Sequence, residues 1–142
     1  MSSTTRSMSQ VVTEAVADFR ALVPECVAAG LVDMSTGMLL AVDTLEEHPN
    51  EVLDLLAAAT FDLFQGRNVS IIRDVFAERN GKGERQYFQE MLVNSDELVH
   101  LFLRSNRHQD LVAVIVCKRV SNIGMLFAQA RVVMKQMDAD FA

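Results

Sequence analysis

Few residues of this chain have the types and spacing that chemistry requires. The three histidines, His48, His100 and His108, have no second histidine or cysteine at the spacing of a zinc site, which needs three or four convergent ligands. The Gly-Lys-Gly run at 81–83 lacks the upstream glycine and the following Ser or Thr of a phosphate-binding loop. No serine lies in a Gly-x-Ser-x-Gly turn. We therefore expect no enzymatic activity, no catalytic residue, no cofactor and no metal.

The two cysteines also point away from chemistry. Cys26 and Cys117 both lie within apolar runs, where a free cysteine behaves as a small buried hydrophobic residue. No basic residue precedes Lys118 in either run, so we expect both thiols to be free and slow to react. The N-terminal residues lack the apolar core of a signal sequence, and the longest apolar stretch, 111–117, is too short to span a bilayer. The sequence thus predicts a cytoplasmic protein with no membrane span.

Charge is distributed unevenly along the chain. The net charge is −6, and residues 1–62 hold ten acids and two bases, whereas residues 63–142 hold eleven bases and nine acids. Nucleic acid is disfavoured as a partner, because phosphate binding requires a clustered positive field. The acidic first half instead indicates an acidic face on the protein.

Hydrophobic spacing predicts the elements that must position these residues. Apolar residues recur at helical spacing in four segments and form strand-length runs in five, and Pro24 ends the first helix. The predicted fold class is α+β: one layered domain over 1–142, with its core at about 8–138 and a five-stranded, mostly antiparallel sheet flanked by helices in the order α-β-β-α-β-β-β-α. The expected helices are 7–23, about 49–66, 67–80 and 122–138, and the expected strands are 26–32, 38–42, 86–93, 97–103 and 111–117.

The predicted helix at 49–66 is unusual because apolar residues cover roughly 200° of its circumference. A helix that packs on one surface needs a narrower stripe, so this helix is expected to bury two surfaces. The remaining arc is acidic and has one apolar residue at its edge. It is either a solvated face, which is the commoner outcome, or a surface that binds a partner. This strip consists of Glu51, Asp54, Leu55, Ala58, Asp62 and Gln65.

Three segments resemble the roadblock family, typified by dynein light-chain roadblock proteins and bacterial regulators of Ras-like GTPases. Residues 23–33 with 36–41 look like the opening hairpin of that family, and 98–104 look like its fourth strand. Residues 121–126 with Ala130-Arg131 resemble its Asn-Leu-Gly start of the last helix. The resemblance implies a roadblock/profilin-like fold. The charged connection at 67–85 is longer than the usual one.

The resemblance also implies a quaternary structure and a function. Roadblock proteins join their third strands edge to edge and pack their middle helices together, which agrees with the wide apolar arc. We expect a homodimer that binds a small Ras-like GTPase or another protein partner through the acidic strip. The alternative of an arginine finger from Arg67, Arg73 or Arg79 is less favoured. The expected dimer interface is Leu53, Ala57, Phe61, Phe64, Phe88 and Met91.

A second interpretation is a signalling domain of PAS- or GAF-like architecture that senses a small ligand. Such a domain would hold the ligand between sheet and helix and would need convergent polar groups in an apolar cavity. The candidates on expected strands are His100 and Tyr87. Recovery of a small GTPase as the partner would discriminate between the two interpretations.

Overall fold

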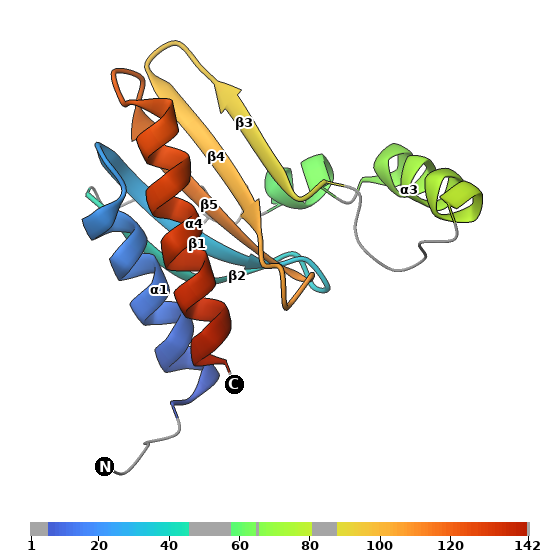
Figure 1. Ribbon diagram of the computed structural model, residues 1–142, viewed down its shortest axis with the longest axis horizontal. Coiled ribbons are helices and arrows are strands. Elements are labelled where there is room, and N and C mark those ends of the chain that lie inside the picture. The colour runs from blue at the N-terminus through green and yellow to red at the C-terminus, as the bar shows by residue number, and fades with distance from the viewer. Residues whose placement is uncertain (1–5, 46–57, 65, 81–87, 142) are drawn as a thin grey trace.

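The computed structural model describes residues 6–45, 58–64, 66–80 and 88–141. A helical segment covers 58–64 in addition to the labelled elements, which follow the predicted order along the chain (Figure 1). The labelled elements are α1 (Met8–Leu22), β1 (Cys26–Asp33), β2 (Met38–Thr44), α3 (Arg67–Asn80), β3 (Glu90–Asn94), β4 (Leu98–Arg104), β5 (Leu111–Lys118) and α4 (Ile123–Asp140).

The strands form one five-stranded sheet in the order β2-β1-β5-β4-β3. Every neighbouring pair is antiparallel, which confirms the predicted fold class. The three inner strands β1, β5 and β4 are mostly buried, whereas β2 and β3 lie at the edges of the described sheet.

The third strand begins later than the sequence indicated. Its pairing with β4 starts at Glu90 opposite Leu103, and residues 88 and 89 are not strand. Before Glu90, Arg104 makes the remaining contacts: its backbone N–H donates to the Gln89 carbonyl at 2.8 Å, and its side-chain Nε donates to the Phe88 carbonyl at 2.9 Å. The expected start at 86 lies outside the described residues.

Local signals explain where the two long helices begin. Ser7 accepts a hydrogen bond from the Gln10 backbone N–H, and the Gln10 side chain accepts one from the Ser7 N–H, which together form a capping box. Asn122 caps α4 by accepting from the Met125 N–H at 3.1 Å. The predicted helices at 7–23 and 122–138 are therefore confirmed, with small shifts in their ends.

The sheet carries a separate apolar core on each face. The larger core lies beneath α1 and α4, which run side by side across one face (Figure 1). The smaller core includes Phe64 from the helical segment 58–64 and lies on the other face, because it contains Val32 while the larger core contains its strand neighbour Leu31. Of the helices described, none has the length and apolar content needed to cross a membrane.

Candidate interaction surfaces

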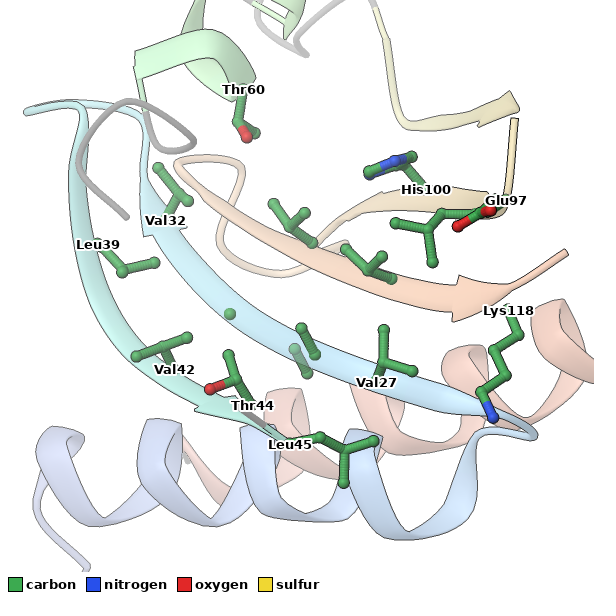
Figure 2. A pocket seen from close by; sticks show the side chains of 16 residues that line it. Val27, Val32, Leu39, Val42, Thr44, Leu45, Thr60, Glu97, His100 and Lys118 are labelled. Atoms are coloured by element: carbon green, nitrogen blue, oxygen red, sulfur yellow. The ribbon is translucent and has the colours of Figure 1, made fainter. Parts of the chain in front are cut away.

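The face of the sheet opposite α1 and α4 is hollowed into a groove of about 720 Å³ (Figure 2). Small residues of β1, Ala28 and Gly30, lie along it between larger side chains of β2 and β5. A methyl group at Gly30 would lie 3.2 Å from Leu39 Cδ1, which is a tight contact. Glycine at this position therefore leaves the groove free of a side chain. The walls are aliphatic and include Leu39, Val42, Val114 and Val116.

Polar side chains lie on the border of this groove. Thr60 approaches it from the helical segment 58–64, and His100 from β4 (Figure 2). Burial lowers the pKa of His100, which favours its neutral imidazole. At one end, the Lys118 ammonium lies 3.9 Å from the Glu25 carboxylate. The groove is mostly aliphatic and has the charged side chains Glu97 and Lys118 in its lining, which suits apolar contact better than acid–base chemistry.

The groove also bears on the ligand-binding interpretation of the sequence. It contains His100, one of the two polar candidates, whereas Tyr87 lies outside the described residues. Thr60 was missed as a polar group because its spacing placed it among the apolar residues of the expected middle helix. Its side chain is only 2% exposed.

Two members of the acidic strip lie within the described residues. Ala58 and Asp62 are both exposed and are four positions apart on the helical segment 58–64, so they share one helix face. The other members of the strip lie outside the described residues: Glu51, Asp54, Leu55 and Gln65.

The expected dimer residues that the structure describes gather around the smaller core. Phe61, Phe88 and Met91 are half-buried and pack against it from the helical segment 58–64 and from the region of β3. Phe64 is fully buried inside the chain, with its ring centroid 5.8 Å from that of Phe102. Phe64 thus belongs to the buried core against which the half-buried residues pack. Leu53 and Ala57 lie outside the described residues.

Arg104 ties this cluster together. Its Nε donates to the Phe88 carbonyl, its Nη1 donates to the Gln109 carbonyl, and its guanidinium lies 5.1 Å from the centroid of the Phe64 ring. Burial lowers its pKa to about 10, although the nearby Asp110 opposes that change. An arginine at a strand end gives no sequence signal for this role, because its partners come from three separate segments.

The edge strand β3 is also anchored to α4. Arg131 makes a two-pronged contact with the Glu90 carboxylate, with Nε and Nη2 at 2.8 and 2.7 Å, and its guanidinium lies 4.8 Å from the Phe127 ring centroid. The Arg131 hydrogen bonds lower the pKa of Glu90 despite partial burial. Within the described sheet β3 pairs only with β4, so its other edge presents backbone groups that a further strand could bind.

The two cysteines are free and buried, and they face each other across β1 and β5. The Cys117 thiol lowers the pKa of Cys26 by hydrogen bonding, aided by Arg20, whereas that hydrogen bond and burial raise the pKa of Cys117. Folding also brings Arg20 beside Cys26, a basic neighbour that the local sequence run does not contain. The Arg20 Nη1 donates to the Cys26 carbonyl at 2.5 Å.

The arginines considered as possible fingers lie on α3. Arg73 contacts the carboxylate of Asp74 at 3.0 Å, and Arg67 is exposed. The side chain of Arg79 is not among those described. Within the described part of the chain, no group of three His, Cys, Asp or Glu side chains is placed to hold a metal ion.

Comparison with solved structures identifies the fold. The roadblock/LC7 domain from Streptomyces avermitilis matches with a TM-score of 0.65 and 16% identity, over 89% of this chain and 94% of that chain. The gliding protein MglB from Thermus thermophilus matches with a TM-score of 0.67 and 16% identity, over 95% and 92%. MglB from Myxococcus xanthus matches with a TM-score of 0.68 and 13% identity, over 99% and 94%.

The sequence comparisons add no relative to these structures. No protein-family model matches the chain, and no curated protein matches it. The resemblance seen in the sequence is thus supported by the structure, and the chain has the roadblock fold.

Proposed function

We propose that this chain is a non-enzymatic, dimeric module that regulates a Ras-like small GTPase in the cytoplasm. The observation that carries the proposal is the roadblock fold, which extends over nearly the whole chain. Bacterial regulators of Ras-like GTPases typify the family that the sequence resembles, which supports a regulatory role here. The fold alone does not specify a function, so the surfaces must supply the rest.

The proposed dimer uses the edge of β3 and the side chains beside it. Two copies of an edge strand can pair through their unbonded backbone groups, which extends the sheet across the two chains. Half-buried Phe61, Phe88 and Met91 would complete their burial in such a pair. Leu53 and Ala57 belong to the same proposed interface. Phe64 lies inside the chain, in the core against which Phe61 packs.

The proposed GTPase-binding surface is the acidic strip. Exposed Asp62 and the neighbouring acids would steer a basic partner surface, and Leu55 with Ala58 would add a small apolar contact. Any effect on GTP hydrolysis would arise because the bound chain positions the switch loops of the GTPase itself.

The decisive experiment is binding to a purified partner. The immobilised chain would capture proteins from native lysate, and a recovered small GTPase would then be titrated in its GDP form and with a non-hydrolysable GTP analogue. Asp62→Lys should slow association, because it reverses a charge in the steering surface. Asp18→Lys reverses an exposed charge on α1 and serves as the matched control. Equal effects of the two variants, or no binding of any small GTPase, would contradict the proposal.

The groove favours one other candidate function, the sensing of an apolar small molecule. Its volume lies within the range of ligand pockets, and Thr60 and His100 border its aliphatic walls. Native mass spectrometry of the purified protein would detect such a ligand. A ligand present in the unaltered protein and absent from Val114→Trp, which fills the groove, would establish this function instead.

A further inference from the structure

Cys26 and Cys117 lie side by side on neighbouring strands. Cys26 is the first residue of β1, and its partner in the antiparallel register with β5 is Cys117. Both thiols are free, and both belong to the larger core. The Cys117 thiol also hydrogen-bonds to that of Cys26. Two thiols in contact on facing strands can be oxidised together, which a single buried cysteine cannot.

A β-bulge brings the two thiols to the same face of the sheet. Alternation along β1 places Ala29 and Leu31 in the larger core, and in a regular strand it would place Cys26 on the opposite face. The register between β1 and β5 shifts between Cys26 and Ala28, so β1 has one extra residue there. This shift turns Cys26 into the larger core, where Cys117 already lies. The contact between the thiols is therefore a product of the bulge.

Strand geometry leaves the two cysteines close enough for a disulfide. The Lys118 backbone N–H donates to the Glu25 carbonyl at 3.0 Å, which places a ladder hydrogen bond at this pair. Cys26 and Cys117 come next along the two strands and are therefore a non-hydrogen-bonded pair, whose Cα atoms are typically about 4.5 Å apart. Disulfides join residues with Cα atoms about 4.4–6.8 Å apart. A bridge can thus form without rearrangement of the sheet.

The surroundings give the two thiols different roles. The hydrogen bond from Cys117, aided by Arg20, lowers the pKa of Cys26, so Cys26 forms a thiolate more readily. That hydrogen bond and burial raise the pKa of Cys117, which keeps its proton. Cys26 is 6% exposed and Cys117 is fully buried, which admits a small oxidant to Cys26 more readily than a protein or peptide disulfide.

We propose that Cys26 and Cys117 form a peroxide-sensitive dithiol, in which Cys26 is oxidised and Cys117 closes an intramolecular disulfide between β1 and β5. The Cys26 thiolate attacks one oxygen of hydrogen peroxide, the O–O bond breaks, and the departing hydroxide takes up a proton to become water. Cys26 is then a sulfenic acid. The Cys117 sulfur displaces its hydroxyl group, which leaves with the Cys117 proton as a second water. The two thiols lose two electrons in total, and these reduce the peroxide.

The bridge would fasten the end of the sheet where both long helices join it. α1 ends at Leu22, shortly before β1, and α4 begins at Ile123, shortly after β5. A disulfide between residues 26 and 117 closes most of the chain into a loop, which restricts the unfolded state and stabilises the fold. Disulfides in a reducing cytoplasm are transient and mostly catalytic or redox-sensing, so this one would respond to oxidation. The site depends neither on the proposed dimer nor on GTPase binding.

Titration of the reduced, purified chain with hydrogen peroxide tests the site. Intact-mass spectrometry should show a loss of about 2 Da, because a disulfide removes one hydrogen from each thiol. Digestion without reductant should yield the Cys26 and Cys117 peptides joined to each other. The melting temperature should rise by about 5 °C or more, and dithiothreitol should reverse all these changes.

Three variants test the two roles and the register. Cys117→Ala removes the second thiol, so peroxide should leave a sulfenic acid on Cys26 that dimedone traps. Cys26→Ala leaves only the buried thiol, which should react at least about 10-fold more slowly. The matched control combines Cys117→Ala with Val116→Cys. It keeps two cysteines but moves the second to the other face of β5, so no bridge should form within the chain.

The outcomes decide the proposal on the wild type first, so they do not depend on the folding of a variant. A reversible bridge in the wild type that is absent from the relocated-cysteine control supports it. The proposal is wrong if peroxide adds oxygen to the wild type without removing the two hydrogens, or if the bridge forms only in denaturant. A control that bridges at the wild-type rate would equally overturn it. Circular dichroism confirms that the control is folded before its rate is compared.

Discussion

The two faces of the sheet are completed in different ways. On one face, α1 and α4 cover a large core whose residues, among them Phe19, Leu31 and Leu101, are fully buried within a single chain. The other face has a smaller core beside an open groove, with half-buried Phe61 and Met91 at its border. The first face supplies stability by itself, whereas the second leaves apolar surface exposed in the part of the chain that the structure describes. The following experiments test this contrast.

The largest expected effect is on the covered face. Leu101→Ala removes a fully buried side chain from the larger core and should lower the free energy of unfolding by about 2–5 kcal/mol. Val42→Ala removes methyl groups from the groove, where Val42 is 40% exposed, and should cost less than about 1 kcal/mol. Urea denaturation of both variants measures the difference. Equal losses would mean that the groove is as well packed as the core.

The second experiment tests whether the open face meets a second chain. Phe61→Glu places a charge in the proposed interface, where burial without a partner costs several kcal/mol. The expected product is a monomer of about half the wild-type mass, or an aggregate, in sedimentation velocity. Ala58→Glu adds the same charge to an exposed position of the same helical segment and should leave the dimer intact. A folded dimer of the Phe61 variant would place the interface elsewhere.

The third experiment compares the two thiols of the covered face. The pKa of Cys26 is lowered by Cys117 and Arg20, so more of it is thiolate at a given pH, while the raised pKa of Cys117 keeps that thiol protonated. Iodoacetamide should modify Cys26 first, with a rate that rises at lower pH than for an ordinary thiol. Cys117 should react only on unfolding. Mass spectrometry of digested protein gives both rates, and faster labelling of Cys117 would contradict this assignment.

The smallest expected effect concerns the contact that holds the edge of β3. The pKa of Glu90 is lower in the folded protein than in the unfolded chain, so the ion pair with Arg131 stabilises the fold above the unfolded pKa. This contribution is lost as the pH falls through the folded pKa. It should be below about 1 kcal/mol, because both side chains are partly exposed to solvent. Glu90→Gln should be less stable than wild type at pH 7 and nearly equal to it in acid. A difference that is independent of pH would show that charge is not the cause.

Much of the fold follows from the sequence itself. Apolar spacing predicts the helices and strands in the correct order, and Ser7, Pro24 and Asn122 mark helix ends, because periodicity and capping depend on residues close together in the chain. The resemblance to roadblock proteins likewise came from short local segments and was supported by the solved structures. The functional surfaces stay predictions, since the acidic strip falls largely outside the described residues.

Tertiary structure decided the features that depend on residues distant in sequence. It placed Arg20 beside Cys26, and it buried the side chain of Phe64 in the core of its own chain. It also gave Arg104 partners from separate segments. None of these contacts has a local signal, because each arises only when the sheet brings remote strands and helices together. The sequence alone determined which surfaces are apolar or acidic, and the packing of the chain decided which of them remain exposed.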